Sequence, residues 1–253
     1  SPQMVLRLSA SASSAVVVSA LLCAACGVDL RATEEAGPTE VEKPDQWFPM
    51  NDAANLGRDI SGNARHGLAV ALSAVTDASR GQVARFADSA LVFVPVMKQD
   101  FTISLWVKTE QLGPAGDFWS DGPRIFNGDI SGVHLDFSLA LLLDKAALGA
   151  GMPDDSDADK LALKSARSVV DGAWHHLAIT RDGERGLWSL FVDGELDTSR
   201  SGATGPLVLP DSVSFGVLGE TDPKTPPLEA DLSDARLYSR ALSAEAVAFL
   251  ATR

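Results

Sequence analysis

The segment WHHLAITRDGERGLWSLFVDGELDT, from Trp174 to Thr198, decides the fold class of this chain. It holds two runs rich in β-branched and aromatic residues, Trp174–Arg181 and Leu187–Val192, and an Asp-Gly dipeptide follows each run, at 182–183 and at 193–194. Asp-Gly next to such runs is a strong short-range signal for a β-hairpin, because both residues tolerate the backbone angles of a tight turn. The segment therefore predicts consecutive antiparallel strands.

The chain after Gln46 continues in the same way. Apolar residues alternate in part along Phe101–Lys108, which predicts another strand, and the tryptophans of two such apolar strands, Trp106 and Trp174, are expected to fill the core. Shorter runs of the same character predict strands at 124–128, 134–139, 213–219 and 235–238. The stretch 140–164 is interpreted as an insertion or an elaborated sheet edge.

One helix is predicted, at the end of the chain. Ser243 is a typical N-cap, Glu245 lies in the first turn, and Val247 and Leu250 share one face. Many short strands, no alternation of strands with helices and this one helix predict an all-β fold of two packed antiparallel sheets, with the helix at an edge of the sandwich. We expect one domain, residues 46–253.

Composition excludes several classes of protein. With 253 residues and 45% hydrophobic residues, the chain is not wholly disordered. A formal net charge of −13 argues against a nucleic-acid partner, because phosphate binding needs a basic face. The two cysteines, Cys23 and Cys26, both lie near the N-terminus and cannot form a disulfide framework for the domain.

The first 27 residues resemble a secretory signal. Arg7 is followed by an apolar stretch of about a dozen residues, the usual length of a signal's hydrophobic region. Ala24-Ala25-Cys26 resembles the end of a bacterial lipoprotein box, which implies lipidation of Cys26 and a lipid anchor as the only membrane contact. We expect secretion across the inner membrane and an outer-membrane or cell-surface lipoprotein. Residues 28–45 carry Pro, Gly and Glu without apolar periodicity and are expected to be a disordered tether.

Four segments of the domain resemble the laminin-G-like jelly roll of the concanavalin A-like lectin/glucanase group. Asp59-Ile-Ser-Gly-Asn63 is similar to the opening D-x-S-G-N motif of this family, and Phe101–Lys108 is similar to its F-T-I-S-x-W-V-K strand. The hairpin around Trp174–Gly194 and the segment Asp234–Glu245 resemble its central and closing motifs. The resemblance covers about 46–252 and implies an antiparallel jelly-roll β-sandwich, which in this family binds carbohydrate or protein.

The resemblance also implies a structural calcium ion at the rim of the sandwich. Asp59 and Asn63 lie in a Gly-containing loop that can direct oxygen ligands inward, and Asp234 could join them. The alternative is that Asp59 and Asn63 only cap a turn. A second acidic group, with four aspartates within 152–160, lacks the central Gly and terminal Glu of a calcium loop, and is interpreted as a solvated charge run.

Trp119 is the candidate ligand-binding residue, because it lies in the loop GDFWSDG between Asp117 and Asp121. An exposed tryptophan beside carboxylates suits a sugar, with the ring against the apolar face of the sugar and the carboxylates on its hydroxyls. The alternative, which we favour, is a loop anchor tucked against the core edge.

No catalytic constellation is identified in the sequence. Asp193, Glu195 and Asp197 alternate like the paired carboxylates of a glycosidase, but Asp193 belongs to the expected hairpin turn. The adjacent His175 and His176 point to opposite faces of a strand and are interpreted as structural. We therefore expect a non-catalytic module that binds a glycan or a surface protein at the bacterial cell envelope. A jelly-roll glycoside hydrolase and a purely structural envelope component are the alternatives.

Overall fold

The computed structural model describes residues 41–130, 133, 135–150, 162–219 and 225–253. The expected signal segment with Cys26, most of the tether and the acidic 152–160 segment lie outside these residues. Within the parts of the chain that the structure describes, no helix has the length and apolar character needed to cross a lipid bilayer.

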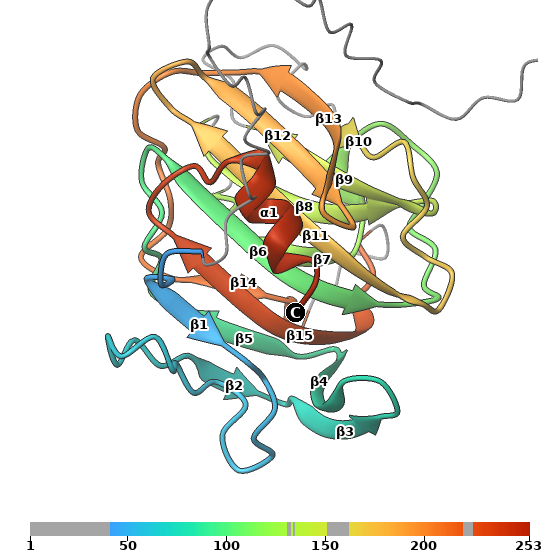
Figure 1. Ribbon diagram of the computed structural model, residues 1–253. Coiled ribbons are helices and arrows are strands. Elements are labelled where there is room, and N and C mark those ends of the chain that lie inside the picture. Colours follow the sequence, from blue (N-terminus) through green and yellow to red (C-terminus); the bar gives the residue numbers. More distant parts are fainter. Residues whose placement is uncertain (1–40, 131–132, 134, 151–161, 220–224) are drawn as a thin grey trace, which may run out of the picture. The chain divides into compact units, whose positions relative to one another are not determined.

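Two antiparallel sheets make up the domain, as the sequence predicts (Figure 1). Seven strands of the eight-stranded sheet follow one another in the order β13 (Glu195–Ser201), β12 (Leu187–Val192), β11 (Trp174–Asp182), β6 (Phe101–Lys108), β15 (Glu229–Tyr238), β4 (Gly81–Ala87), β3 (Ser73–Asp77). The eighth strand, β1 (Gln46–Phe48), pairs with β15 outside this order. The seven-stranded sheet has the order β10 (Leu163–Lys164), β9 (Lys145–Ala150), β8 (Phe137–Leu142), β7 (Arg124–Asn127), β14 (Val213–Phe215), β5 (Ala90–Phe93), β2 (Leu68–Val70). The 140–164 stretch thus contributes β9 and β10, an elaborated edge of the second sheet.

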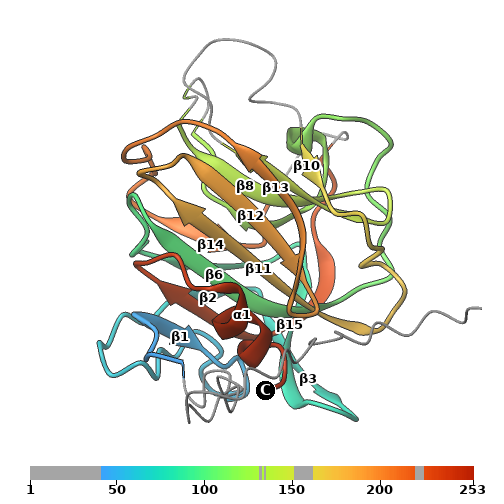
Figure 2. The ribbon, with the colours of Figure 1, turned by 45° about the horizontal axis from the view of Figure 1, so that its top comes forward.

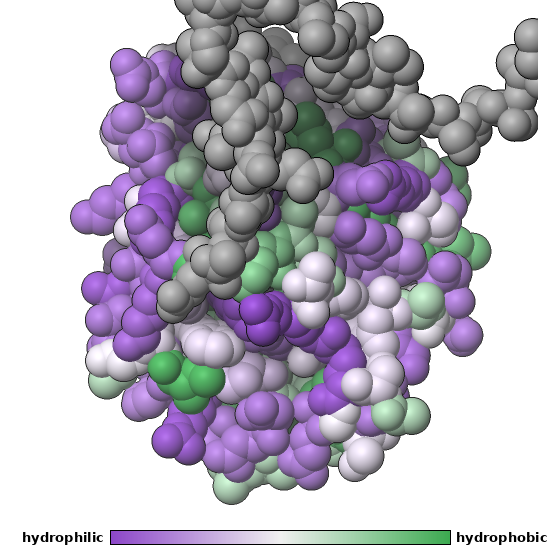
Figure 3. All heavy atoms as spheres, in the orientation of Figure 1, coloured by the Kyte–Doolittle hydropathy of each residue, from purple (hydrophilic) through white to green (hydrophobic). Residues whose placement is uncertain are grey.

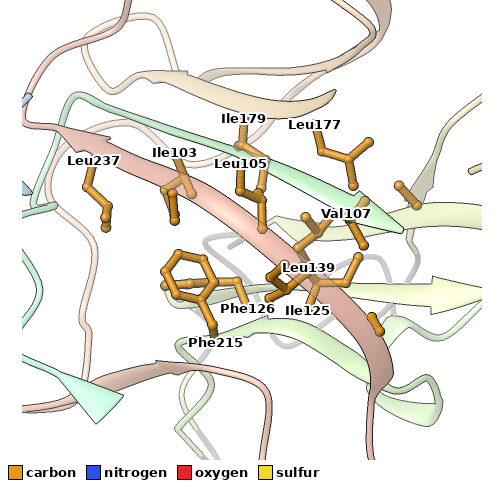
Figure 4. Packing of buried hydrophobic residues seen from close by; sticks show 14 of the residues in the cluster. Ile103, Leu105, Val107, Ile125, Phe126, Leu139, Leu177, Ile179, Phe215 and Leu237 are labelled. Atoms are coloured by element: carbon orange, nitrogen blue, oxygen red, sulfur yellow. The ribbon is translucent and has the colours of Figure 1, made fainter. Parts of the chain in front are cut away.

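The core lies between the two sheets, and every second residue of a central strand points into it. Ile103, Leu105 and Val107 of β6 are almost fully buried there (Figure 4). Aromatic rings join the two layers: Phe101 of one sheet stacks on Phe137 of the other with ring centroids 4.9 Å apart. Burial of such side chains is the main favourable contribution to folding, because it removes apolar surface from water.

The hairpin that decided the fold class forms with two different turns. Asp193 and Gly194 have φ angles of 53° and 81°, the positive values of a type I′ turn, and they join β12 to β13 directly. The other Asp-Gly dipeptide opens a longer connection, because β11 and β12 pair from Asp182 to Leu187 and leave the four residues 183–186 in the loop. Gly186, with φ of 63°, supplies the left-handed position there.

Helix α1 (Ala244–Leu250) begins where the sequence predicts. The side chain of Ser243 accepts a hydrogen bond from the Ala246 N–H, and Val247 is buried. The helix lies on the outer face of the eight-stranded sheet and not at an edge, because Val247 packs against Ala178 of β11 and Phe191 of β12 (Figure 2).

Contacts of the domain begin before Gln46, inside the segment expected to be a tether. Arg240 binds Glu42 at 2.7 Å and donates to the Lys43 carbonyl, and the Asp45 N–H donates to the carbonyl of Leu237. Residues 42–45 are therefore held against the end of β15. The composition of this stretch did not predict this, because its binding groups are backbone atoms and two carboxylates.

Candidate functional site

The loop that follows β1 is organised around the carboxylate of Asp59. This carboxylate accepts hydrogen bonds from the backbone N–H groups of Trp47, Ser61 and Arg65, at 2.8–2.9 Å, and from the Ser61 hydroxyl. Burial on its own raises the pKa of Asp59, but these hydrogen bonds favour the ionised form more strongly, so the pKa is lowered. Asp59 therefore holds the loop against β1 as a charged acceptor.

Trp47 connects this loop to the last strand of the sheet. Its indole N–H donates to Asp234 Oδ1 at 2.6 Å, while its backbone N–H donates to Asp59. Arg236 holds the same Asp234 carboxylate with two nitrogens, at 3.0 and 2.8 Å, and its guanidinium lies 4.5 Å from the centre of the Trp47 ring. The ladder between β15 and β6 shifts register between Ser233 and Arg236, and Asp234 has a φ of 54°. Such a bulge redirects a side chain, here that of Asp234 toward Trp47.

A pocket of about 400 Å³ lies beside Trp47. Volumes of about 300–1,000 Å³ are usual for small-ligand sites. The pocket collects side chains from distant parts of the chain: apolar Trp47 and Ile60, three arginines and one carboxylate, together with Asn51, Ser79 and Ser233. We call it the Trp47 pocket. The charged residues that line it are Arg80, Asp234, Arg236 and Arg253.

Arg80 extends into the pocket from the turn between β3 and β4. Its guanidinium lies 4.1 Å from the ring centre of Trp106 and 5.5 Å from that of Trp174. It donates one hydrogen bond, at 3.2 Å, to the backbone oxygen of Arg253. Burial lowers the pKa of Arg80, and Arg236 acts in the same direction, against the attraction of Asp234 and Asp77.

Trp106 and Trp174 do not fill the core, which corrects the expectation from the sequence. Since Ile103, Leu105 and Val107 face the core, the intervening Trp106 points to the outer face of the sheet. Trp174 lies opposite Lys108, another outward residue, and both tryptophans are half-buried. With Trp47 they form an outward-facing set that we call the tryptophan face. It lies on the side of the domain that carries α1, where Figure 3 shows a mainly hydrophilic surface.

His176 lies within the same face and is 1% exposed. Its Nε2 is 2.8 Å from the Ser104 hydroxyl oxygen, and its ring meets Trp106 edge-on with centroids 5.3 Å apart. Burial lowers the pKa of His176 to about 4, so the imidazole is neutral at pH 7. The His176 ring packs against the ring of Trp106, as expected for a structural histidine.

In the structure the three expected calcium ligands each have other partners. Asp59 and Asp234 contact Trp47 through its backbone and its side chain, and Asn63 donates its amide to the Asp45 carbonyl. No group of three or more His, Cys, Asp or Glu side chains suited to a metal ion occurs among the described residues. Because Arg236 and N–H groups already use the carboxylate oxygens, the arrangement does not fit one calcium ion shared by these residues. Calcium binding by the protein stays a prediction.

Trp119 is not an exposed sugar platform. Trp119 is 7% exposed and begins the short 3-10 helix η1 (Trp119–Asp121). Its indole lies so close to Gly149 that a Cβ atom added to this glycine would be 2.4 Å from the ring. The aromatic residue exposed in this loop is its neighbour Phe118, at 40%. Asp117 forms an ion pair with Lys164 at 2.7 Å, and Asp121 is half-buried at the end of η1. The loop is therefore an anchor, the alternative that the sequence favoured.

Two larger depressions have no tryptophan in their lining. One, of about 550 Å³, has an acidic charged lining, because the carboxylates outnumber the cations, and Arg85 pairs with Asp231 at 2.8 Å. Its charged residues are Arg85, Lys108, Glu110, Glu229 and Asp231. The other, of about 630 Å³, lies between His66 and Lys98 and has no tryptophan, tyrosine or phenylalanine in its lining. The Trp47 pocket is the smaller space but has the lining that suits a specific polar ligand.

Comparison with known proteins identifies the family. A family model of the laminin G type, for the concanavalin A-like lectin/glucanases superfamily, matches residues 80–248. The chain belongs to this superfamily. The match to the concanavalin A-like family begins at Arg80 and ends within α1, so the Asp59 loop and β1 lie outside it.

One curated relative matches part of this concanavalin A-like domain. It is the rat (Rattus norvegicus) "Sushi, von Willebrand factor type A, EGF and pentraxin domain-containing protein 1", with 32% identity over 99 residues. The match covers 37% of this chain and 3% of the relative.

Solved structures resemble the concanavalin A-like domain at low identity and show its fold. Domain 4 of the arabinanase AbnA from Geobacillus stearothermophilus, solved with arabinotriose, has a TM-score of 0.59 and 20% identity, and the match covers 83% of this chain and 98% of that one. The binding domain of botulinum neurotoxin DC has been solved in complex with SialylT (TM-score 0.61, 10% identity) and with rat synaptotagmin II (0.60, 12%). Each of these two matches covers 83% of this chain and 51% of the toxin domain.

The carboxylates of the β12–β13 hairpin all have partners in this concanavalin A-like domain. Asp193 accepts from the His176 N–H and contacts the His175 ring, Glu195 pairs with Arg167, and Asp197 accepts from the Ala166 N–H. These contacts join the hairpin to its neighbours. They are the contacts expected of turn and loop anchors.

Proposed function

We propose that the protein is a non-catalytic glycan-binding module and that the Trp47 pocket is its binding site. The observation that carries the proposal is the lining of the pocket, which combines an apolar wall with polar side chains that converge from separate segments. A sugar ring has an apolar face of C–H groups and a rim of hydroxyls. A site for it therefore needs an aromatic or aliphatic surface next to a few well-placed donors and acceptors.

The residues of the pocket divide into these two roles. Trp47 and Ile60 supply the apolar wall, and Ile60 is 39% exposed. Asn51, Ser79 and Ser233 supply amide and hydroxyl groups that can both donate and accept. Asp59 and Asp234 fix Trp47 from two sides, so the wall is ordered before a ligand arrives, which lowers the entropy cost of binding.

The similar structures support a binding role. The arabinanase domain was solved with arabinotriose, and the neurotoxin domain was solved with SialylT and with synaptotagmin II. A protein partner is therefore the alternative ligand for this chain. The glycan is preferred because the Trp47 pocket is a concave polar space of small-ligand size.

A glycan array probed with the full chain tests the proposal, together with two matched variants. Ile60 lines the pocket, whereas Leu68 is an exposed leucine outside it. We expect Ile60→Ala to weaken binding to the retained glycans and Leu68→Ala to leave it unchanged. An array on which no glycan is retained, or binding that Ile60→Ala does not change, would overturn the proposal.

We further propose that Cys26 is lipidated and that a tether up to about residue 41 carries the domain at the cell envelope. The support is the apolar segment that ends in Ala24-Ala25-Cys26 and the spacer composition after it. Replacing Cys26 with Ser should move the protein from the membrane fraction to the soluble fraction in the host cell. Unchanged partition and processing of the variant would refute the anchor.

A further inference from the structure

Among the described residues, Arg80 differs from Arg236 and Lys108, the other two cations beside the tryptophans, in having no aspartate or glutamate side chain within ion-pair distance. Arg236 binds Asp234 at 2.8 Å, and Lys108 binds Asp77 at 2.9 Å. Within the described residues, no aspartate or glutamate side chain lies within 4.0 Å of the Arg80 guanidinium, and its buried Nε has no hydrogen-bond partner. Asp234 and Asp77 attract Arg80 without forming an ion pair with it, so an anionic group that enters the pocket can form a direct pair with this guanidinium.

The charges of the Trp47 pocket lead to the same conclusion. Three arginines, Arg80, Arg236 and Arg253, line it with one carboxylate, Asp234, which Arg236 already holds. The pocket is thus positive in a chain whose formal net charge is −13. A local positive site on an acidic protein favours an anionic group over a neutral or cationic one, because its field acts at short range.

The protein holds the Arg80 side chain in place before any ligand binds. The carboxylate of Asp77 accepts hydrogen bonds from the N–H groups of Ser79 and Arg80, at 2.8 and 3.1 Å, which fixes the turn. Trp106 and Trp174 then lie against the guanidinium, at 4.1 and 5.5 Å. Stacking of this kind leaves the remaining N–H donors of the guanidinium free to bind an oxyanion.

We propose that the Trp47 pocket selects acidic glycans, and that Arg80 pairs with the carboxylate or sulfate group of the sugar. This inference rests on the proposed glycan-binding function and adds the class of ligand to it. Arg80 supplies the charge-assisted hydrogen bonds, and Trp47 and Ile60 contact the apolar face of the ring. A purely structural alternative is that Arg80 only clamps Trp106 and the backbone of Arg253, in which case its loss affects all ligands equally.

Isothermal titration of the full chain with three sugars tests the inference. The probes are trigalacturonate, a sulfated galactose trisaccharide and neutral arabinotriose. We expect at least one acidic sugar to bind about tenfold or more tightly than arabinotriose, the equivalent of one charge-assisted contact, and its affinity to fall with added salt. Preference for trigalacturonate assigns a carboxylate group, and preference for the sulfated sugar assigns a sulfate group.

Two substitutions connect the preference to Arg80. Arg80→Gln should remove the difference between acidic and neutral sugars, while Arg80→Lys keeps the charge and part of the difference. Arg85→Gln is the matched control, because Arg85 is an arginine of neighbouring β4 that is already paired with Asp231. Equal affinity of wild type for acidic and neutral sugars, or an Arg80→Gln variant that keeps the preference, would overturn the inference and leave glycan binding intact. Absence of binding to all three sugars would instead overturn this inference and count against the pocket as a sugar site.

Discussion

Acidification of the solution tests the buried position of His176, which supports the tryptophan face. Burial lowers the pKa of His176 to about 4, with Asp193 opposing and Arg236 and Arg80 adding to the shift. The ordinary pKa is about 6.5, so between pH 6.5 and 4 the unfolded chain binds more protons at this residue than the folded chain. The free energy of unfolding should therefore fall as the pH drops through this window, by at most about 3 kcal/mol from this group.

Urea unfolding of wild type and His176→Gln at several pH values between 7 and 4 measures this contribution. Glutamine can keep a hydrogen bond to Ser104 but does not titrate, so the variant should lose less stability in acid than wild type. His175→Gln is the control: the pKa of His175 is raised, because Asp193 and Asp171 outweigh its burial, so this residue favours folding in acid. The reasoning is wrong if wild type and His176→Gln show the same pH dependence, or if the His176 imidazole titrates near pH 6.5 by NMR.

Three further predictions concern the rest of the domain. Gly149→Ala should lower stability by about 1–3 kcal/mol in urea unfolding, because the new methyl group would meet the Trp119 indole; an unchanged midpoint would show that Trp119 does not lie there. Asp59→Asn should also destabilise the domain, by about 1–3 kcal/mol, because a neutral amide replaces the carboxylate that accepts three backbone N–H groups. The difference in the free energy of unfolding between variant and wild type should disappear below the lowered pKa of Asp59, because the wild-type carboxyl is then also protonated. A chelator tests the calcium that the family resemblance implies: if the folded chain binds calcium through residues other than the set Asp59, Asn63 and Asp234, the melting temperature should fall, and an unchanged melting temperature would refute calcium binding.

The fold was predictable because its signals are local. The Asp193-Gly194 dipeptide sets the two positive φ angles of a hairpin, and the Ser243 side chain caps the only helix expected. The direction of Trp106 was also in the sequence: Ile103, Leu105 and Val107 fix which side of β6 faces the core. The apolar composition of the strand favours a core position for Trp106, but the period of two places this residue on the opposite side, as the structure has it.

The site was only partly predictable because its contacts join distant residues. Asp59 and Asp234 both contact Trp47, but Arg236 and the two N–H groups of Trp47 occupy oxygens that were expected to bind calcium. Arg80 gave no signal as a single arginine after a turn, since its partners Trp106 and Trp174 are far along the chain. Trp119 is buried because Gly149, 30 residues later, leaves room for its ring.

Titration of the full chain with trigalacturonate and with arabinotriose, followed by the NMR signals of the tryptophan indole N–H groups, tests the central claim most directly. The signal of Trp47, whose indole N–H is bonded to Asp234, should shift in a saturable way with at least one of the two sugars. The signals of two buried tryptophans, Trp188 in the core and Trp119 at the start of η1, should stay in place. A Trp47 signal that does not move while either sugar binds would show that the glycan site lies elsewhere.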